Sequence, residues 1–358
     1  MTALPRPDTT LDPHFALRCA IGITLTYVLV EPLGVQPASI LPAMAVSQIC
    51  SQRGDYSPSK TFVGAVITIA IIWMTFGVTT LVREEMLVFV SVILAILYGA
   101  FYFLLRTGNP LAILVIIFTT LLSVLSAESP AAAEAMRDAY TVTSIVTALL
   151  VPVLNLVLPV SRVDASPAAV AAAPAGDPQA GMQALLRVLA LAPILFGLWF
   201  VFPPSDVIMP IMACLVLAYP TRSAQRTETF ERLTATMLGG VISLAILLLF
   251  SWQAQFPALY LLIFLVALWF TRRMVTGPAS VNTYQVSLTV IAGLVSTGMT
   301  SSHPMQDAVQ RLVLTFGGTA MALAGLVFLA SILVWRPRRT RAGNEDLAYW
   351  RSPHVGQG

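Results

Sequence analysis

The chain has little charge. Only 10% of its 358 residues are Asp, Glu, Lys or Arg, and Lys60 is its one lysine. Soluble domains carry roughly 25% charged residues. Since 57% of this chain is hydrophobic, most of it is expected to lie in lipid. The formal net charge of +3 is too small to indicate a nucleic-acid partner, and none is expected.

Residues that carry chemistry are also scarce. The three histidines lie near the chain ends or in loops, and the sequence has no Gly-x4-Gly-Lys-Ser/Thr pattern. Three cysteines fall within or beside apolar segments, without the spacing of metal ligands: Cys19, Cys50 and Cys214. We therefore expect no ATP hydrolysis, no metal, no cofactor and no enzymatic activity.

Long apolar runs, in contrast, are abundant. A membrane-spanning helix needs about 20 apolar residues. We take ten apolar segments as the clear spans: 15–30, 61–82, 86–105, 110–127, 140–160, 182–202, 233–250, 256–270, 281–295 and 312–335. Two further apolar segments are short and contain proline: 35–50, with Pro37 and Pro42, and 207–219, with Pro210. Counting both gives an all-α polytopic membrane protein with about twelve transmembrane helices.

The two halves of the chain share landmarks. Arg18 and Arg187 lie at the start of long apolar segments, whereas Arg53 and Arg222 follow the two short ones. Both pairs are 169 residues apart. A repeat of this length predicts two six-helix units. Because six crossings return the chain to its starting side, the units are expected to be parallel repeats.

The distribution of arginine supports twelve crossings. With the loops assigned alternately, seventeen basic residues fall on one side and three on the other, namely Arg83, Arg137 and Arg311. This bias predicts that both termini are cytoplasmic. The polar start of the chain lacks the features of a signal peptide, and we interpret it as a cytoplasmic tail.

The domain boundaries follow from this count. We expect a first six-helix repeat over 1–160 and a second over 181–335. An Ala/Pro-rich cytoplasmic linker over 161–180 joins them, and a basic cytoplasmic tail covers 336–358.

At this point the chain resembles the fusaric acid resistance / aromatic acid exporter superfamily. In each half, an Ala-Leu-Arg-type opening is followed by a short proline-containing segment, a basic turn, and a helix with an early glycine. The clearer copy is TRSAQRTETFERLTATMLGG at 221–240, which looks like the superfamily's Arg-x6-Gly-Gly/Ala pattern. The first copy has Ser57-Pro58-Ser59-Lys60 where that arginine is expected before Gly64.

The resemblance implies an efflux component of the bacterial inner membrane. It implies a small anionic or aromatic substrate and a periplasmic adaptor of the membrane-fusion type as partner, with contacts to inner-membrane lipids and a possible homo-oligomer. Proton coupling is expected. The alternative is a non-transporting membrane scaffold for envelope assembly.

The short segments are where we expect the substrate. Proline removes an N–H and frees the carbonyl four residues earlier, so Pro42 and Pro210 are expected to expose backbone acceptors. A simple packing kink is the alternative. Glu31 and Asp206 lie nearest these segments and are candidate proton-coupling carboxylates, or else solvated charges at the outer surface.

Other polar residues recur in both halves. Arg53 and Arg222 can bind a carboxylate at the inner mouth, or can simply anchor the chain. Three more repeated features are Gly64 with Gly239 or Gly240, Asn109 with Asn282, and Arg137 with Arg311. We include the asparagines as substrate-binding candidates, and the last arginine pair as an anion exit site or local ion pairs. The glycines are expected to allow close helix packing, and Arg18 and Arg187 to extend to the membrane surface.

Overall fold

The computed structural model describes residues 12, 14–51, 57–159, 179–200, 208–219, 222–252 and 255–300, and individual helical positions between 306 and 328. The described residues form helices and no strands. The helices are α1 (Phe15–Leu33), α2 (Ile40–Ser51), α3 (Pro58–Val82), α4 (Met86–Thr107), α5 (Leu111–Glu128), α6 (Pro130–Val157), α7 (Ala180–Phe200), α8 (Ile208–Leu217), α9 (Arg222–Trp252), α10 (Phe256–Thr276) and α11 (Val281–Thr300).

Eight of these helices are long and apolar enough to cross a membrane: α1, α3, α4, α5, α6, α7, α10 and, over Thr227–Trp252, α9. The chain is therefore an all-helical, multi-pass membrane protein. The expected last span, 312–335, falls mostly outside the described residues, as does the linker over 161–178.

The two short segments form short helices. α2 has 12 residues and α8 has 10, which at about 1.5 Å per residue gives lengths of about 18 and 15 Å. Neither helix alone crosses a hydrocarbon core of about 30 Å. Pro42 and Pro210 are each the third residue of their helix.

In α2, Pro42 therefore lies in the first turn and does not interrupt the helix, while a role of Pro42 and Pro210 in substrate binding stays a prediction. In the first turn the backbone N–H has no partner within the helix in any case, so proline is accommodated without breaking a hydrogen bond. The carbonyl of Ala38 lies before α2 and is not released from it. The corresponding carbonyl of Asp206 lies outside the described residues.

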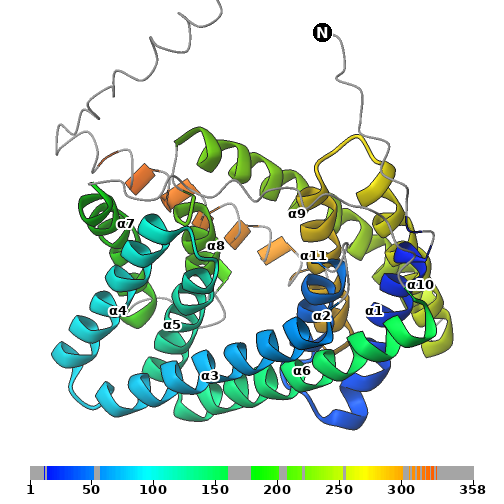
Figure 1. Ribbon diagram of the computed structural model, residues 1–358, viewed down its shortest axis with the longest axis horizontal. Coiled ribbons are helices and arrows are strands. Elements are labelled where there is room, and N and C mark those ends of the chain that lie inside the picture. The colour runs from blue at the N-terminus through cyan, green and yellow to red at the C-terminus, as the bar shows by residue number, and fades with distance from the viewer. Residues whose placement is uncertain are drawn as a thin grey trace, which may run out of the picture.

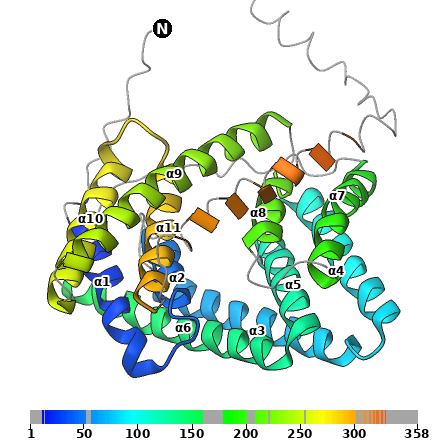
Figure 2. The ribbon, with the colours of Figure 1, turned by 180° about the vertical axis from the view of Figure 1, so that it is seen from behind.

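The helices gather into two groups (Figure 1). The α1 group contains α1, α2, α10 and α11, and the α4 group contains α4, α5, α7 and α8. Between the groups, α3 and α6 pack against each other along one edge, and α9 runs along the opposite edge (Figure 2). The α1 group therefore combines helices from the two ends of the described chain, whereas the α4 group is built from its middle.

Helices from distant parts of the chain pack in matching pairs. α1 packs on α10, whereas α4 packs on α7, and α2 packs on α11, whereas α5 packs on α8. Polar contacts join these pairs. The Thr271 hydroxyl of α10 donates to the Ala16 carbonyl of α1 at 3.3 Å, and Thr120 Oγ1 of α5 lies 3.3 Å from Cys214 Sγ of α8.

Each group has its own apolar core. The core of the α1 group includes Cys19, Cys50 and Phe270, and extends onto the end of α6. The core of the α4 group includes Phe101, Leu191 and Cys214. All three cysteines, which lie within or beside apolar segments of the sequence, are buried.

Candidate functional site

Glu31 lines a cavity of about 300 Å³ at the end of α1. The other lining residues come from α1, the turn before α2, the start of α10 and the end of α11: Tyr27, Val30, Gly34, Gln36, Ala38, Phe256, Tyr260, Ser296 and Met299. Glu31 is the charged residue among them and is itself exposed. We call this space the Glu31 cavity.

Local structure explains why the carboxylate faces this space. α1 ends at Gly34, whose φ of 62° is left-handed and whose N–H donates to the Glu31 carbonyl at 3.1 Å. Glycine adopts this conformation without strain. The chain then turns into the segment before α2, which supplies Gln36 and Ala38. Two tyrosines and one carboxylate thus surround a space large enough for a small organic molecule.

A second cavity, of about 340 Å³, lies at the opposite group and is called the Trp199 cavity. It is lined by Arg83, Glu84, Met86, Phe89, Ser126, Ala127, Glu128, Pro130, Trp199 and Phe200. The indole N–H of Trp199 has no acceptor among the described residues. The Trp199 cavity is lined by three charged residues, Arg83, Glu84 and Glu128, whereas Glu31 is the charged residue of the Glu31 cavity.

The two cavities occupy matching positions in the chain. Val30 and Trp199 are 169 residues apart, Phe89 and Tyr260 are 171, and Ser126 and Ser296 are 170. These spacings agree with the 169-residue spacing of the arginines. Residues at about this spacing therefore line both cavities.

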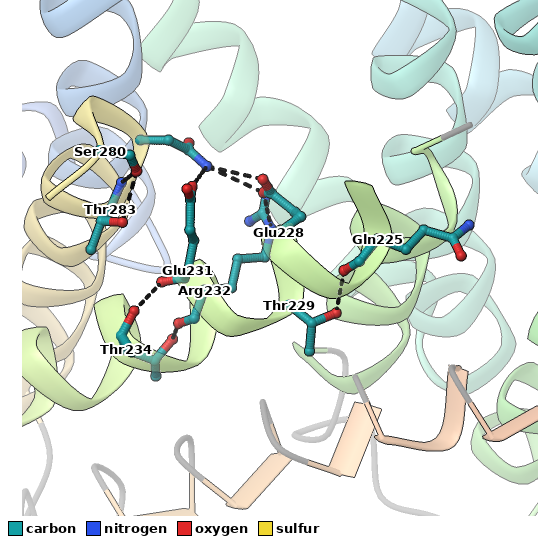
Figure 3. Close-up of polar contacts among 10 residues, drawn as sticks. Gln225, Glu228, Thr229, Glu231, Arg232, Thr234, Ser280 and Thr283 are labelled. Atoms are coloured by element: carbon teal, nitrogen blue, oxygen red, sulfur yellow. Dashed lines mark hydrogen bonds and ion pairs between the residues drawn. The ribbon is translucent and has the colours of Figure 1, made fainter. Parts of the chain in front are cut away.

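A buried polar cluster lies where the start of α9 meets α11 (Figure 3). Glu228, which is 5% exposed, forms an ion pair with Arg232, with Oε1 2.6 Å from Nε. Asn282 Nδ2 donates to both oxygens of Glu228, at 3.1 and 3.3 Å, and to Glu231 Oε2 at 3.3 Å. We call these four residues, with Tyr219, the Glu228 cluster.

Tyr219 connects this cluster to α7 and α8. Its carbonyl accepts hydrogen bonds from Arg187 Nη2 and Gln225 Nε2, each at 2.9 Å. Its hydroxyl contacts Glu228 and Arg232. Burial, and then the negative charge of Glu228, raise the pKa of the Tyr219 hydroxyl to about 12, so this group remains a neutral donor at physiological pH.

The expectation for Arg18 and Arg187 is wrong. Both are 3% exposed and do not extend to the membrane surface. Arg18 donates to the Leu158 carbonyl at 3.0 Å and pairs with Asp12 at 3.0 Å, whereas Arg187 donates to Tyr219. A buried guanidinium needs acceptors, and loop carbonyls supply them here.

The two asparagines have different surroundings. Asn109 Oδ1 accepts the N–H of Leu111 at 3.0 Å, which caps the start of α5. Asn282 instead contacts carboxylates on another helix. The structure thus brings one member of the predicted pair into a polar cluster, and leaves the other in a local turn.

Arg137 is held on the outside of α3 and α6. Its guanidinium lies 4.3 Å from the Trp73 ring centre and 4.5 Å from that of Phe76, and it pairs with Asp138 at 2.7 Å. This is the local pairing given above as the alternative to an anion exit site. Arg53, Asp206 and Arg311 lie outside the described residues. For Arg222 only the backbone, at the start of α9, is described.

Glu228 was not among the predicted site residues. Its segment is part of the 221–240 pattern, but the apolar span was expected to begin only at 233. The missed signal is the spacing of Gln225, Glu228 and Arg232, which places three polar side chains on one face of a helix that begins at Arg222.

With the geometry in place, the comparison with known families can be stated. Residues 188–325 match the sequence model of the family described as fusaric acid resistance protein-like. Residues 188–325 belong to that family. The match covers α8 to α11 and most of α7, so it includes the Glu228 cluster and excludes Glu31.

The fusaric acid resistance-like match supports a role in membrane transport or efflux of small compounds. It confirms the family predicted from the repeated pattern. No curated protein and no solved structure matches the chain.

Proposed function

We propose that this protein exports small anionic or aromatic compounds across the bacterial inner membrane, with Glu31 as a proton-coupling carboxylate. The observation that carries the proposal is the position of Glu31, the charged residue of a cavity walled by Tyr27 and Tyr260. A carboxylate within a membrane protein is a functional candidate by default, because its charge is costly to keep there.

The architecture we propose is two parallel six-helix halves with twelve crossings. The matching pairs α1–α10 and α4–α7 support it, as do the matching positions of the two cavities. Transport would then occur by rocking of the halves, with each cavity at the outer end. We propose that both termini are cytoplasmic. Single-cysteine accessibility from each side of the membrane tests this.

We also propose residues that bind the substrate or a proton, and a partner protein. Arg53 and Arg222 are assigned to an anion at the inner mouth, and Asp206 to the same role as Glu31 in the second half. A periplasmic adaptor is proposed as partner. A gene for such an adaptor beside this one, and its co-purification after cross-linking in cells, would support that assignment.

Glu31→Gln tests the proposed function. In a deletion strain we expect accumulation of an aromatic carboxylate such as benzoate, complementation by the wild-type gene, and loss of complementation by Glu31→Gln at equal expression. Glu85→Gln is the matched control, because Glu85 is exposed at the start of α4 and lines neither cavity.

A proton gradient imposed on inverted vesicles tests the coupling. Wild-type vesicles should take up substrate faster with the gradient than without it, and Glu31→Gln vesicles should lose that difference. If the deletion strain handles every anion tested like the wild type, the export proposal is refuted and the scaffold alternative is favoured.

A further inference from the structure

The Glu228 cluster joins four parts of the chain at one point. Arg187 belongs to α7, Tyr219 follows α8, Glu228 and Arg232 belong to α9, and Asn282 belongs to the first turn of α11. α7 and α8 are in the α4 group, whereas α11 is in the α1 group. Together with Arg187, which donates to the Tyr219 carbonyl, the cluster therefore connects both groups through the start of α9.

Glu228 contacts side chains from three places in the chain. Its carboxylate forms an ion pair with Arg232, accepts hydrogen bonds from Asn282 and contacts the Tyr219 hydroxyl. The side chains of Glu228 and Arg232 are 6% and 12% exposed. In such surroundings an ion pair is stable only while its partners stay in place, because each charge alone would be buried without compensation. A small movement of the α1 group of helices relative to the α4 group would therefore break the contacts of the cluster together.

α9 and α11 are held together independently of these charges. A Cβ placed on Gly239 would lie 2.7 Å from the Ser287 carbonyl oxygen, so the two helices approach closely there. α9 and α11 consequently stay together when the cluster opens. The contact that can separate is the one between the cluster and Tyr219, at the end of the short helix α8.

We propose that Glu228, Arg232 and Asn282, with Tyr219, form a polar lock that holds α8 to α9 and α11, and that each transport cycle requires this lock to open. The three side chains are positioning residues, which act by fixing the helices rather than by contacting substrate. Opening in the transport cycle rests on the proposed function, whereas the lock itself does not.

The lock is tested on purified protein with a reporter cysteine. Thr229→Cys places a thiol beside Glu228, at a residue that is 8% exposed. The native cysteines are buried and report global unfolding if they become reactive. In this background, Glu228→Gln and Arg232→Gln should each raise the maleimide reaction rate at position 229 by about tenfold or more, which corresponds to about 1.4 kcal/mol in the opening equilibrium.

Two further variants make the result specific. The charge exchange E228R/R232E should return the rate toward that of the parent protein, because the ion pair can form again. Thr234→Ala, on the exposed side of α9, should leave the rate unchanged.

Unchanged rates in Glu228→Gln and Arg232→Gln would refute the lock, as would faster labelling accompanied by reaction of the native cysteines. If the lock variants label faster but no substrate is exported by the parent protein, the lock stands and the export proposal fails. The reverse result, with export intact and labelling unchanged, removes the lock alone.

Discussion

Gly239 and Gly64 occupy related positions early in α9 and α3, and the structure predicts opposite effects for the same substitution. At Gly239 a Cβ would lie 2.7 Å from the Ser287 carbonyl oxygen and 2.9 Å from Val290 Cβ. At Gly64 a Cβ would meet nothing within 4 Å. Close packing was expected at both glycines, and the structure shows it at Gly239 but not at Gly64.

The magnitude follows from these distances. Ordinary contact begins near 3.4 Å, so Gly239→Ala must separate α9 from the α11 backbone by about 0.7 Å. Overpacking costs about 1–3 kcal/mol. The upper part of that range applies, because the obstacle is a backbone oxygen and not a flexible side chain. Since alanine is favoured over glycine in a helix by about 1 kcal/mol, the net loss is about 1–2 kcal/mol.

Gly64→Ala gains the higher helix propensity of alanine without the cost of overpacking. We expect it to raise the free energy of unfolding by up to about 1 kcal/mol. For a chain of this length, the two variants should then differ in Tm by about 3 °C. The assay is thermal unfolding in detergent, followed by tryptophan fluorescence, with Gly77→Ala as a second substitution into open space. A Tm of Gly239→Ala at or above that of Gly64→Ala would refute the packing argument.

Three other predictions follow from the described contacts. Native protein should not react with maleimide until denatured, as mass spectrometry can show, because its three cysteines are buried: Cys19, Cys50 and Cys214. Asn109→Ala should lower the free energy of unfolding by about 1 kcal/mol through loss of the α5 cap, and should leave export unchanged in the accumulation assay. Subtracting the absorbance titration of Tyr219→Phe from that of the wild-type protein isolates the ionisation of the Tyr219 phenol. We expect its midpoint near pH 12, not near 10. The contribution of this phenol to stability is therefore complete below pH 10 and is lost as the pH rises toward 12. A midpoint near 10 would contradict the contact with Glu228.

Helix class and several helix positions could be predicted from apolar runs. The expected spans 86–105 and 256–270 match Met86–Thr107 and Phe256–Thr276 at their starts. Lipid imposes this regularity, because every backbone group must be paired within the helix. Glu31 was also chosen from the sequence, since acids beside apolar segments are rare. The structure places it at a cavity, and its role in transport stays a prediction.

Contacts between distant residues could not be predicted. The acceptors of Arg18 and Arg187 lie 140 and 32 residues further along the chain, and no local pattern indicates them. The start of α9 at Arg222 could not be predicted for the same reason, because it depends on contacts with distant residues. Its polar first turns are stabilised by Tyr219 and Asn282, so hydropathy placed the start eleven residues too late.

The pairing of α1 with α10 has a consequence for synthesis. At about 5–20 residues per second, the ribosome needs roughly 10–50 s to pass from α1 to the residues of α10. During that interval the face of α1 that packs on α10 lacks its final neighbours. This face must therefore be sheltered by lipid, by α2 or by the insertion machinery until the second half arrives. Truncations before 256 should leave α1 a target for membrane proteases.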